Sequence, residues 1–172
     1  YKPKKPFLFS IGVMNRKKNY HVLLPLLKHN TMELLIAGKF DDPGYLGFFE
    51  EQSRELGVEN DVRLLGSISE PEKSWYFNNC RAFAFPSIAE GFGLPVVEAM
   101  SCGKPLFLSD RTALPEIGGD VSFYFRDFNA DHIRQVFHNG MKNFNANGLR
   151  EKIKERGKCF SWHKAARQYL EL

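Results

Sequence analysis

The sequence has few of the features that assign a protein quickly to a common class. It contains only three cysteines, Cys80, Cys102 and Cys159, which are far apart and lack a Cys-x-x-Cys or Cys/His ligand spacing. This favours neither a disulfide framework nor a structural zinc site, and reduced thiols fit the cytoplasm. No apolar run approaches the ~18 residues that a membrane-spanning helix needs.

Motifs of several catalytic classes are also missing. Gly-Lys at 38–39, 103–104 and 157–158 is never followed by Ser or Thr, so the phosphate-binding P-loop is excluded. The chain has neither a Gly-x-Ser-x-Gly nucleophile elbow nor a His-Glu-x-x-His zinc motif. His132 and His138, six positions apart on a predicted helix, do not share a face. We therefore expect no metal requirement.

Acidic residues are absent from the first 18 positions, which hold six bases: Lys2, Lys4, Lys5, Arg16, Lys17 and Lys18. The rest of the chain has slightly more acids than bases, so the net charge of +4 does not indicate a nucleic-acid partner. The N-terminus continues into a strand-like run rather than a long apolar helix with a cleavage site, so we expect no signal peptide. The chain begins with Tyr rather than Met, which suggests a piece of a longer protein.

Short apolar runs alternate with amphipathic stretches along the 172 residues, 43% of which are apolar. Because the runs show little polar alternation, they predict a parallel sheet covered on both faces. The predicted strands are 7–13, 33–37, 61–65, 81–85, 105–108 and 121–125. The predicted helices are 20–29 (with Pro25 inside), 45–56, 70–79, 95–101, 131–144, 148–158 and 162–170.

This alternation predicts one α/β domain over residues 1–172, with a Rossmann-like, doubly wound parallel sheet of about six strands. Helices cover both faces, and the C-terminal segment is helical. In such a fold, a ligand lies at the carboxyl ends of the strands, near the point where the strand order reverses.

The segment 85–98, with the sequence FPSIAEGFGLPVVE, joins a predicted strand to a predicted helix. Gly91 and Gly93 allow the backbone to bend tightly and to approach a ligand closely. Pro95 suits the first position of a helix, whereas Leu94 has no side-chain oxygen to cap one. The first N–H groups of this helix are therefore free to bind an anion or sugar oxygens.

Two carboxylates flank this turn, Glu90 in the loop and Glu98 about one turn inside the helix. We expect both to face the same crevice above the sheet. A carboxylate can accept hydrogen bonds from two hydroxyls, so such a pair suits a ligand with vicinal hydroxyls, such as ribose or a hexose.

These segments resemble retaining GT-B glycosyltransferases of the large family 4 group, the glycosyl transferases group 1. The spacing Glu90-x7-Glu98 within PSIAEGFGLPVVEAMSCGKP resembles the family signature. FLFSIGVMNRKKNYHVLLPLL resembles the first strand, phosphate loop and helix of the family's C-terminal domain, and LLGSISEPEKSWYFNNC its next strand and helix. The ending FSWHKAARQYLEL resembles its Trp-containing last helix. The resemblance therefore covers nearly the whole chain.

The resemblance implies a role for each matched position. Glu98 holds the ribose of the donor nucleotide, Glu90 binds or polarises the donor sugar, and Lys18 neutralises the diphosphate leaving group. Glu90 and Lys18 are thus the catalytic candidates. The family's Arg directly after the first-strand glycine is Val13 here, which leaves Arg16 or Lys17 to replace it. The other donor contacts implied are Gly12, Arg16, Ile68, Gly91, Phe92, Gly93 and Leu94.

For the parent enzyme, the resemblance implies transfer of a hexose from a UDP- or GDP-linked sugar to a carbohydrate or lipid-linked acceptor, with retention of configuration. No cofactor or metal is required, and the sequence has no Asp-x-Asp. We expect polysaccharide biosynthesis in the cytoplasm or at the cytoplasmic membrane face. The N-terminal acceptor domain is missing here, so we expect the isolated chain to be inactive.

Two alternatives stay open at this point. Gly91-x-Gly93 with Asp110 about 20 residues on resembles a dinucleotide-binding fingerprint. However, Val96 occupies the third glycine position, and Glu90 would repel a pyrophosphate. The second alternative is a module that binds a nucleotide sugar and catalyses nothing.

Overall fold

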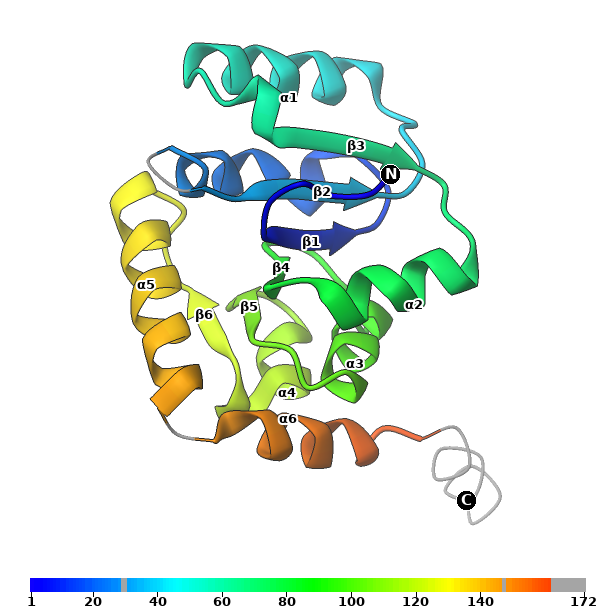
Figure 1. The fold of residues 1–172 in the computed structure, drawn as a ribbon, viewed down its shortest axis with the longest axis vertical. Coiled ribbons are helices and arrows are strands. Elements are labelled where there is room, and N and C mark those ends of the chain that lie inside the picture. The colour runs from blue at the N-terminus through cyan, green and yellow to red at the C-terminus, as the bar shows by residue number, and fades with distance from the viewer. Residues whose placement is uncertain (29–30, 147, 162–172) are drawn as a thin grey trace.

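Six parallel strands form one sheet in the order β3-β2-β1-β4-β5-β6 (Figure 1). The structure is a computed structural model that describes residues 1–28, 31–146 and 148–161. The strands are β1 (Phe7–Ile11), β2 (Glu33–Ala37), β3 (Val62–Gly66), β4 (Ala82–Phe85), β5 (Leu106–Ser109) and β6 (Phe123–Phe125). The prediction of a doubly wound α/β fold with about six parallel strands is confirmed.

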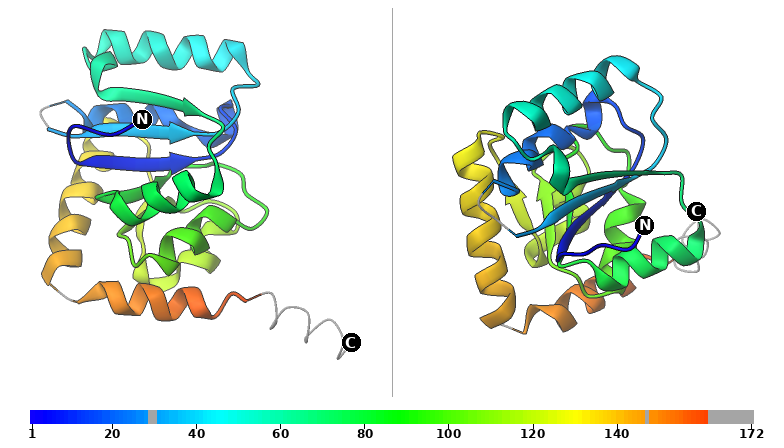
Figure 2. Two further views of the ribbon diagram at one scale, coloured as in Figure 1. Left: turned by 45° about the vertical axis from the view of Figure 1, so that its right-hand side comes forward. Right: turned by 45° about the horizontal axis from the view of Figure 1, so that its top comes forward.

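Helices surround this sheet (Figure 2). The α-helices are α1 (Pro43–Glu55), α2 (Glu70–Asn79), α3 (Leu94–Ser101), α4 (Leu114–Gly118), α5 (Ala130–Ala146) and α6 (Leu149–Lys158). The 3-10 helices are η1 (Arg16–Lys18), η2 (Tyr20–Leu26), η3 (Glu59–Asp61) and η4 (Gly119–Val121). The predicted helix at 162–170 lies outside the described residues.

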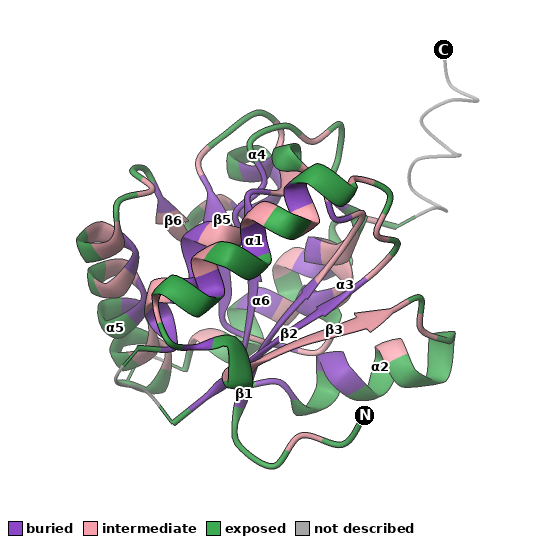
Figure 3. Ribbon diagram, turned by 90° about the horizontal axis from the view of Figure 1, so that it is seen from above, coloured by how far each residue is buried: buried purple, intermediate pink, exposed green. Residues whose placement is uncertain are grey.

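Two apolar layers bury the sheet because successive side chains of a strand point to opposite faces. Leu8 packs with η2, α1 and α5 on one face, whereas its neighbours Phe7 and Phe9 pack with α2, α3, α4 and α6 on the other. The central strands are therefore buried, and the edge strand β3 is only half-buried (Figure 3).

Three local predictions differ from the structure. The helix at 20–29 is a 3-10 helix, Tyr20–Leu26, with Pro25 inside it; proline has no N–H to donate and clashes with the preceding turn of an α-helix. Helix α3 begins at Leu94 rather than Pro95, because Gly93 is the N-cap with φ of 95°. Helix α4 was not predicted, since five residues give too little periodicity to recognise.

The strand order reverses between β1 and β4. From β1 the chain builds outward through β2 and β3, whereas β4 lies on the other side of β1 and leads to β5 and β6. The loops after β1 and β4 thus leave the same edge of the sheet and diverge over opposite faces, which opens a crevice in folds of this kind.

Helix α5 approaches the sheet closely at Gly140, and this contact predicts a stability difference. A Cβ at Gly140 would lie 2.6 Å from Cε1 of Phe107 and 2.8 Å from Cγ of Phe123. Gly140→Ala should therefore lower the free energy of unfolding by about 1 kcal/mol, since overpacking outweighs the gain in helix propensity.

The matched control is Gly47→Ala in α1, where a Cβ would meet nothing within 4 Å. That variant should raise the free energy of unfolding by about 0.5–1 kcal/mol. Urea denaturation of both variants checks the pair, and equal effects would contradict the close packing of α5.

Candidate functional site

Hydrogen bonds tie together the loops that follow β1, β4 and β5. The carbonyl oxygen of Lys17 accepts hydrogen bonds from the backbone N–H of Ile88 at 2.8 Å and from Oγ of Ser87 at 3.0 Å. The hydroxyl of Ser109, at the end of β5, donates to the carbonyl oxygen of Ser87. Ser87 and Ser109 are fully buried, so these contacts fix the loop after β4 against both neighbours.

Glu90, in the loop after β4, contacts both the loop after β1 and the loop after β5. Its side chain accepts a hydrogen bond from Nζ of Lys18 at 2.5 Å, and its backbone N–H donates to Oγ1 of Thr112 at 3.0 Å. The side chains of Lys18 and Glu90 are only 16% and 13% exposed. The ammonium of Lys18 also lies 4.7 Å from the centre of the Phe85 ring. An ion pair thus bridges β1 and β4 where the strand order reverses.

Gly12 leaves room for the lysine of this pair. Its φ is +152°, and a Cβ there would lie 3.0 Å from Cε of Lys18 and 2.9 Å from the hydroxyl oxygen of Tyr20. A residue with a side chain at position 12 would therefore displace Lys18. The predicted site residue Gly12 and the predicted cation are packed against each other.

Three residues of the turn at 91–94 are exposed to solvent, whereas Gly93 is buried. Phe92 and Leu94 are 43% and 50% exposed, which is unusual for large apolar side chains. No side chain caps the start of α3, but Pro95 has no N–H and the N–H of Val96 donates to the carbonyl oxygen of Gly93 at 2.9 Å. That the remaining N–H groups of this turn bind a ligand stays a prediction.

Glu98 has a different cationic partner from Glu90. It lies on α3 and accepts a hydrogen bond from Nζ of Lys73, on α2, at 2.7 Å. Lys73 also pairs with Glu70 at 2.9 Å. The hydrogen bond to Glu98 is the main cause that raises the pKa of Lys73. The two acids are thus held by two lysines from different elements, and their joint contact with one ligand stays a prediction.

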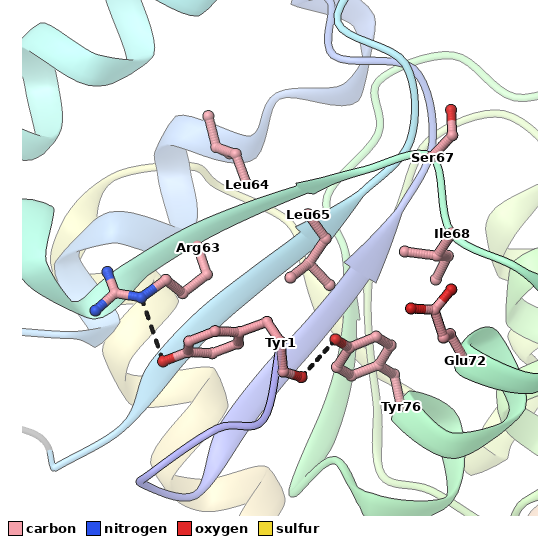
Figure 4. Close-up of a pocket in the computed structure, with 8 residues that line it drawn as sticks. All are labelled: Tyr1, Arg63, Leu64, Leu65, Ser67, Ile68, Glu72 and Tyr76. Carbon is pink, nitrogen blue, oxygen red and sulfur yellow. Dashed lines mark hydrogen bonds between the residues drawn. The ribbon is translucent and has the colours of Figure 1, made fainter.

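Arg16 and Ile68 are not members of these two ion pairs. Arg16 is exposed on η1, and its charge adds to burial in lowering the pKa of His21. Ile68 is half-buried and lines a cavity of about 210 Å³ between β3 and α2, together with Tyr1, Leu65 and Glu72 (Figure 4).

Sequence reasoning missed three residues that hold this region together. Thr112 adopts a left-handed backbone conformation with φ of 50°, unusual for a β-branched residue, while its hydroxyl holds Glu90. Lys73 and Ser87 lie in segments that resemble the family, but neither is part of the Glu90-x7-Glu98 spacing. Their roles depend on contacts between elements, and no sequence signal could have found them.

Residues 1–28, 31–146 and 148–161 offer neither a metal site nor a membrane span. These residues contain no cluster of three or more His, Cys, Asp or Glu side chains that could hold a metal ion. Nor does any helix in this part of the chain combine the length and apolarity needed to cross a membrane.

Residues 1–159 match the family model of the glycosyl transferases group 1. The chain belongs to this family. It is 32% identical over 172 residues to O-antigen chain mannosyltransferase B of Escherichia coli, covering 95% of this chain and 44% of that protein. A Campylobacter jejuni enzyme, N-acetylgalactosamine-N,N'-diacetylbacillosaminyl-diphospho-undecaprenol 4-alpha-N-acetylgalactosaminyltransferase, is 27% identical over 179 residues, 98% of this chain and 46% of that protein.

Solved glycosyltransferases share the fold. Anabaena Alr3699/HepE, in complex with UDP and glucose, superposes with a TM-score of 0.83 at 20% identity, over 97% of this chain and 47% of that one. Sucrose-phosphate synthase from Thermosynechococcus elongatus gives a TM-score of 0.83 at 21% identity, over 98% and 44%. The chain therefore spans a little under half the length of these proteins.

The Lys18–Glu90 pair makes a testable contribution to stability. Removing one partner leaves the other charge poorly solvated. The losses of unfolding free energy in Lys18→Met and Glu90→Gln should therefore sum to more than the loss in the double variant. We expect a coupling energy of about 0.5–3 kcal/mol from a double-mutant cycle in urea.

The matched control is the cycle for Lys158 and Glu155 on α6, whose side chains are 70% and 67% exposed. An exposed helix pair should couple by only about 0.3–0.5 kcal/mol. If Lys18 and Glu90 couple no more strongly than this control, the pair has no structural importance.

Proposed function

We propose that residues 1–172 form the nucleotide-sugar-binding, C-terminal domain of a retaining GT-B hexosyltransferase. The parent transfers a hexose from a UDP- or GDP-linked sugar to a carbohydrate or lipid-linked acceptor, in the cytoplasm or at the membrane face. Family membership supports this reading, and so do the names of the relatives, among them mannosyltransferases and an enzyme named for a diphospho-undecaprenol acceptor. The observation that carries it is the Lys18–Glu90 pair at the point where the strand order reverses.

Lys18 stabilises the negative charge of the leaving group. Breaking the bond between the sugar and the nucleoside diphosphate gathers negative charge on the phosphate. A fixed ammonium in a partly dry site stabilises that charge where it develops. In the free chain the ammonium of Lys18 is held by Glu90 at 2.5 Å. When the donor binds, the ammonium either leaves Glu90 for the phosphate or contacts both. Arg16, exposed on the same loop, adds positive charge.

The remaining residues bind the rest of the donor. Glu90 lies beside the sugar, with the backbone of the 91–94 turn around it. Glu98 accepts the ribose hydroxyls, and Ile68 contacts the base. These carboxylates act on hydroxyls and a sugar rather than on a metal, so the domain works without a metal ion.

The short length of the chain relative to its relatives supports a second domain as its partner. The chain spans under half of its relatives, and the missing N-terminal domain supplies the acceptor half of the cleft. The isolated chain therefore binds donor without transferring sugar. A non-catalytic module is the second candidate, and transfer by the full-length parent excludes it.

Binding measurements test the proposal. The wild-type chain should bind UDP or GDP more tightly than NAD, with no change in excess EDTA. Lys18→Ala should weaken the diphosphate by ~10- to 100-fold, because a charged hydrogen bond is lost, and the unphosphorylated nucleoside much less. Glu90→Ala should mainly weaken the sugar-bearing donor.

Lys158→Ala, on the exposed surface of α6, is the control and should bind like the wild type. Tighter binding of NAD would favour the dinucleotide alternative. Unchanged affinity for both free nucleotide and nucleotide sugar in the Lys18 and Glu90 variants would show that the site is assigned wrongly.

A further inference from the structure

Lys73 is placed where a lysine does not favour its own helix. It is the fourth residue of α2, inside the first turn, where the helix dipole is positive and acidic residues are preferred. The first turn does contain Glu70 and Glu72, and Ser69 caps it in a capping box. The helix dipole therefore disfavours the ammonium of Lys73, and its i,i+3 pair with the exposed Glu70 adds only a few tenths of a kcal/mol to the stability of α2. The contact of Lys73 outside its own helix is then the more informative one.

The contact links two helices. The ammonium of Lys73 lies 2.7 Å from Oε1 of Glu98 on α3 and 2.9 Å from Oε2 of Glu70. Glu70 is 84% exposed, whereas Lys73 is only 20% exposed and Glu98 39%. The ammonium is thus partly withdrawn from water on the side of Glu98, while that carboxylate keeps access to solvent.

A glutamate that must accept two hydroxyls benefits from being held in place. A free glutamate side chain samples many rotamers, and fixing it on ligand binding costs conformational entropy. The bond to Lys73 fixes one carboxylate oxygen of Glu98 before any ligand arrives. A preformed ion pair between α2 and α3 thus lowers the entropic cost of binding at Glu98.

We propose that Lys73 is a positioning residue, which holds the Glu98 carboxylate in the orientation that accepts the ribose hydroxyls of the donor nucleotide. This inference rests on the ribose-binding role proposed for Glu98. Lys73 acts through Glu98 and contacts no part of the nucleotide itself. It therefore influences selectivity for ribose rather than affinity for phosphate or base.

The test compares ribonucleotides with their 2′,3′-dideoxy forms, using calorimetry on the full chain. Wild type should prefer UDP or GDP, whichever binds, over its dideoxy form, and Glu98→Ala should remove this preference. Lys73→Met should weaken the ribonucleotide by ~2- to 10-fold, the cost of immobilising one side chain, and should leave the dideoxy form nearly unchanged. Lys73→Arg should restore the preference in part.

Two further variants complete the design. Lys154→Met removes a lysine that pairs with Glu151 within α6 at 3.3 Å and should behave like the wild type. Lys73→Met added to Glu98→Ala should cause no further loss. An equal loss for both nucleotide forms, tighter binding, or a further loss in the double variant would overturn the positioning role.

The ribose role of Glu98 and the positioning role of Lys73 are tested by different outcomes. If the wild type does not distinguish ribo from dideoxy forms, or Glu98→Ala changes nothing, the ribose role of Glu98 is wrong. If Glu98→Ala removes the preference but Lys73→Met keeps it, only the role of Lys73 is wrong.

Discussion

The pairing of one cation from the loop after β1 with one anion from the loop after β4 organises the functional edge of this fold. Lys18 and Glu90 meet where the strand order reverses, and each is mostly shielded from water. A partly buried charge is costly without a partner, so neither side chain can turn away freely. The pair therefore fixes how the two loops lie relative to each other.

Small and hydroxyl-bearing residues make this pairing possible. Gly12 leaves space that a larger residue would fill, and the hydroxyls of Ser87, Ser109 and Thr112 form hydrogen bonds with backbone groups of these loops. These residues support the geometry of the pair, and no role for Ser87, Ser109 or Thr112 is indicated by the sequence alone. The left-handed conformation of Thr112 shows that the loop accepts local strain to hold Glu90.

The fold could be predicted from the sequence because the period and length of each apolar run are local properties. The six predicted strands agree with the observed ones to within two residues at each end. The errors fall where local signals conflict or are too short, as at Pro25 and at α4. The Glu90-x7-Glu98 spacing also located both acids, but their partners depend on how η1, α2 and α3 pack, which no local pattern encodes.

The different surroundings of the two acids suit two different tasks. Glu90 is nearly buried beside a single lysine and an aromatic ring, where a change of partner has a large electrostatic effect because water screens it poorly. Glu98 is more exposed, and its lysine is shared with Glu70, so charge there is well screened and the bond mainly orients the carboxylate. Strong electrostatics suit a position where charge develops, as proposed for Glu90, and an oriented carboxylate suits the recognition of neutral hydroxyls, as proposed for Glu98. The difference arises because the fold gives two copies of one residue type different degrees of access to water.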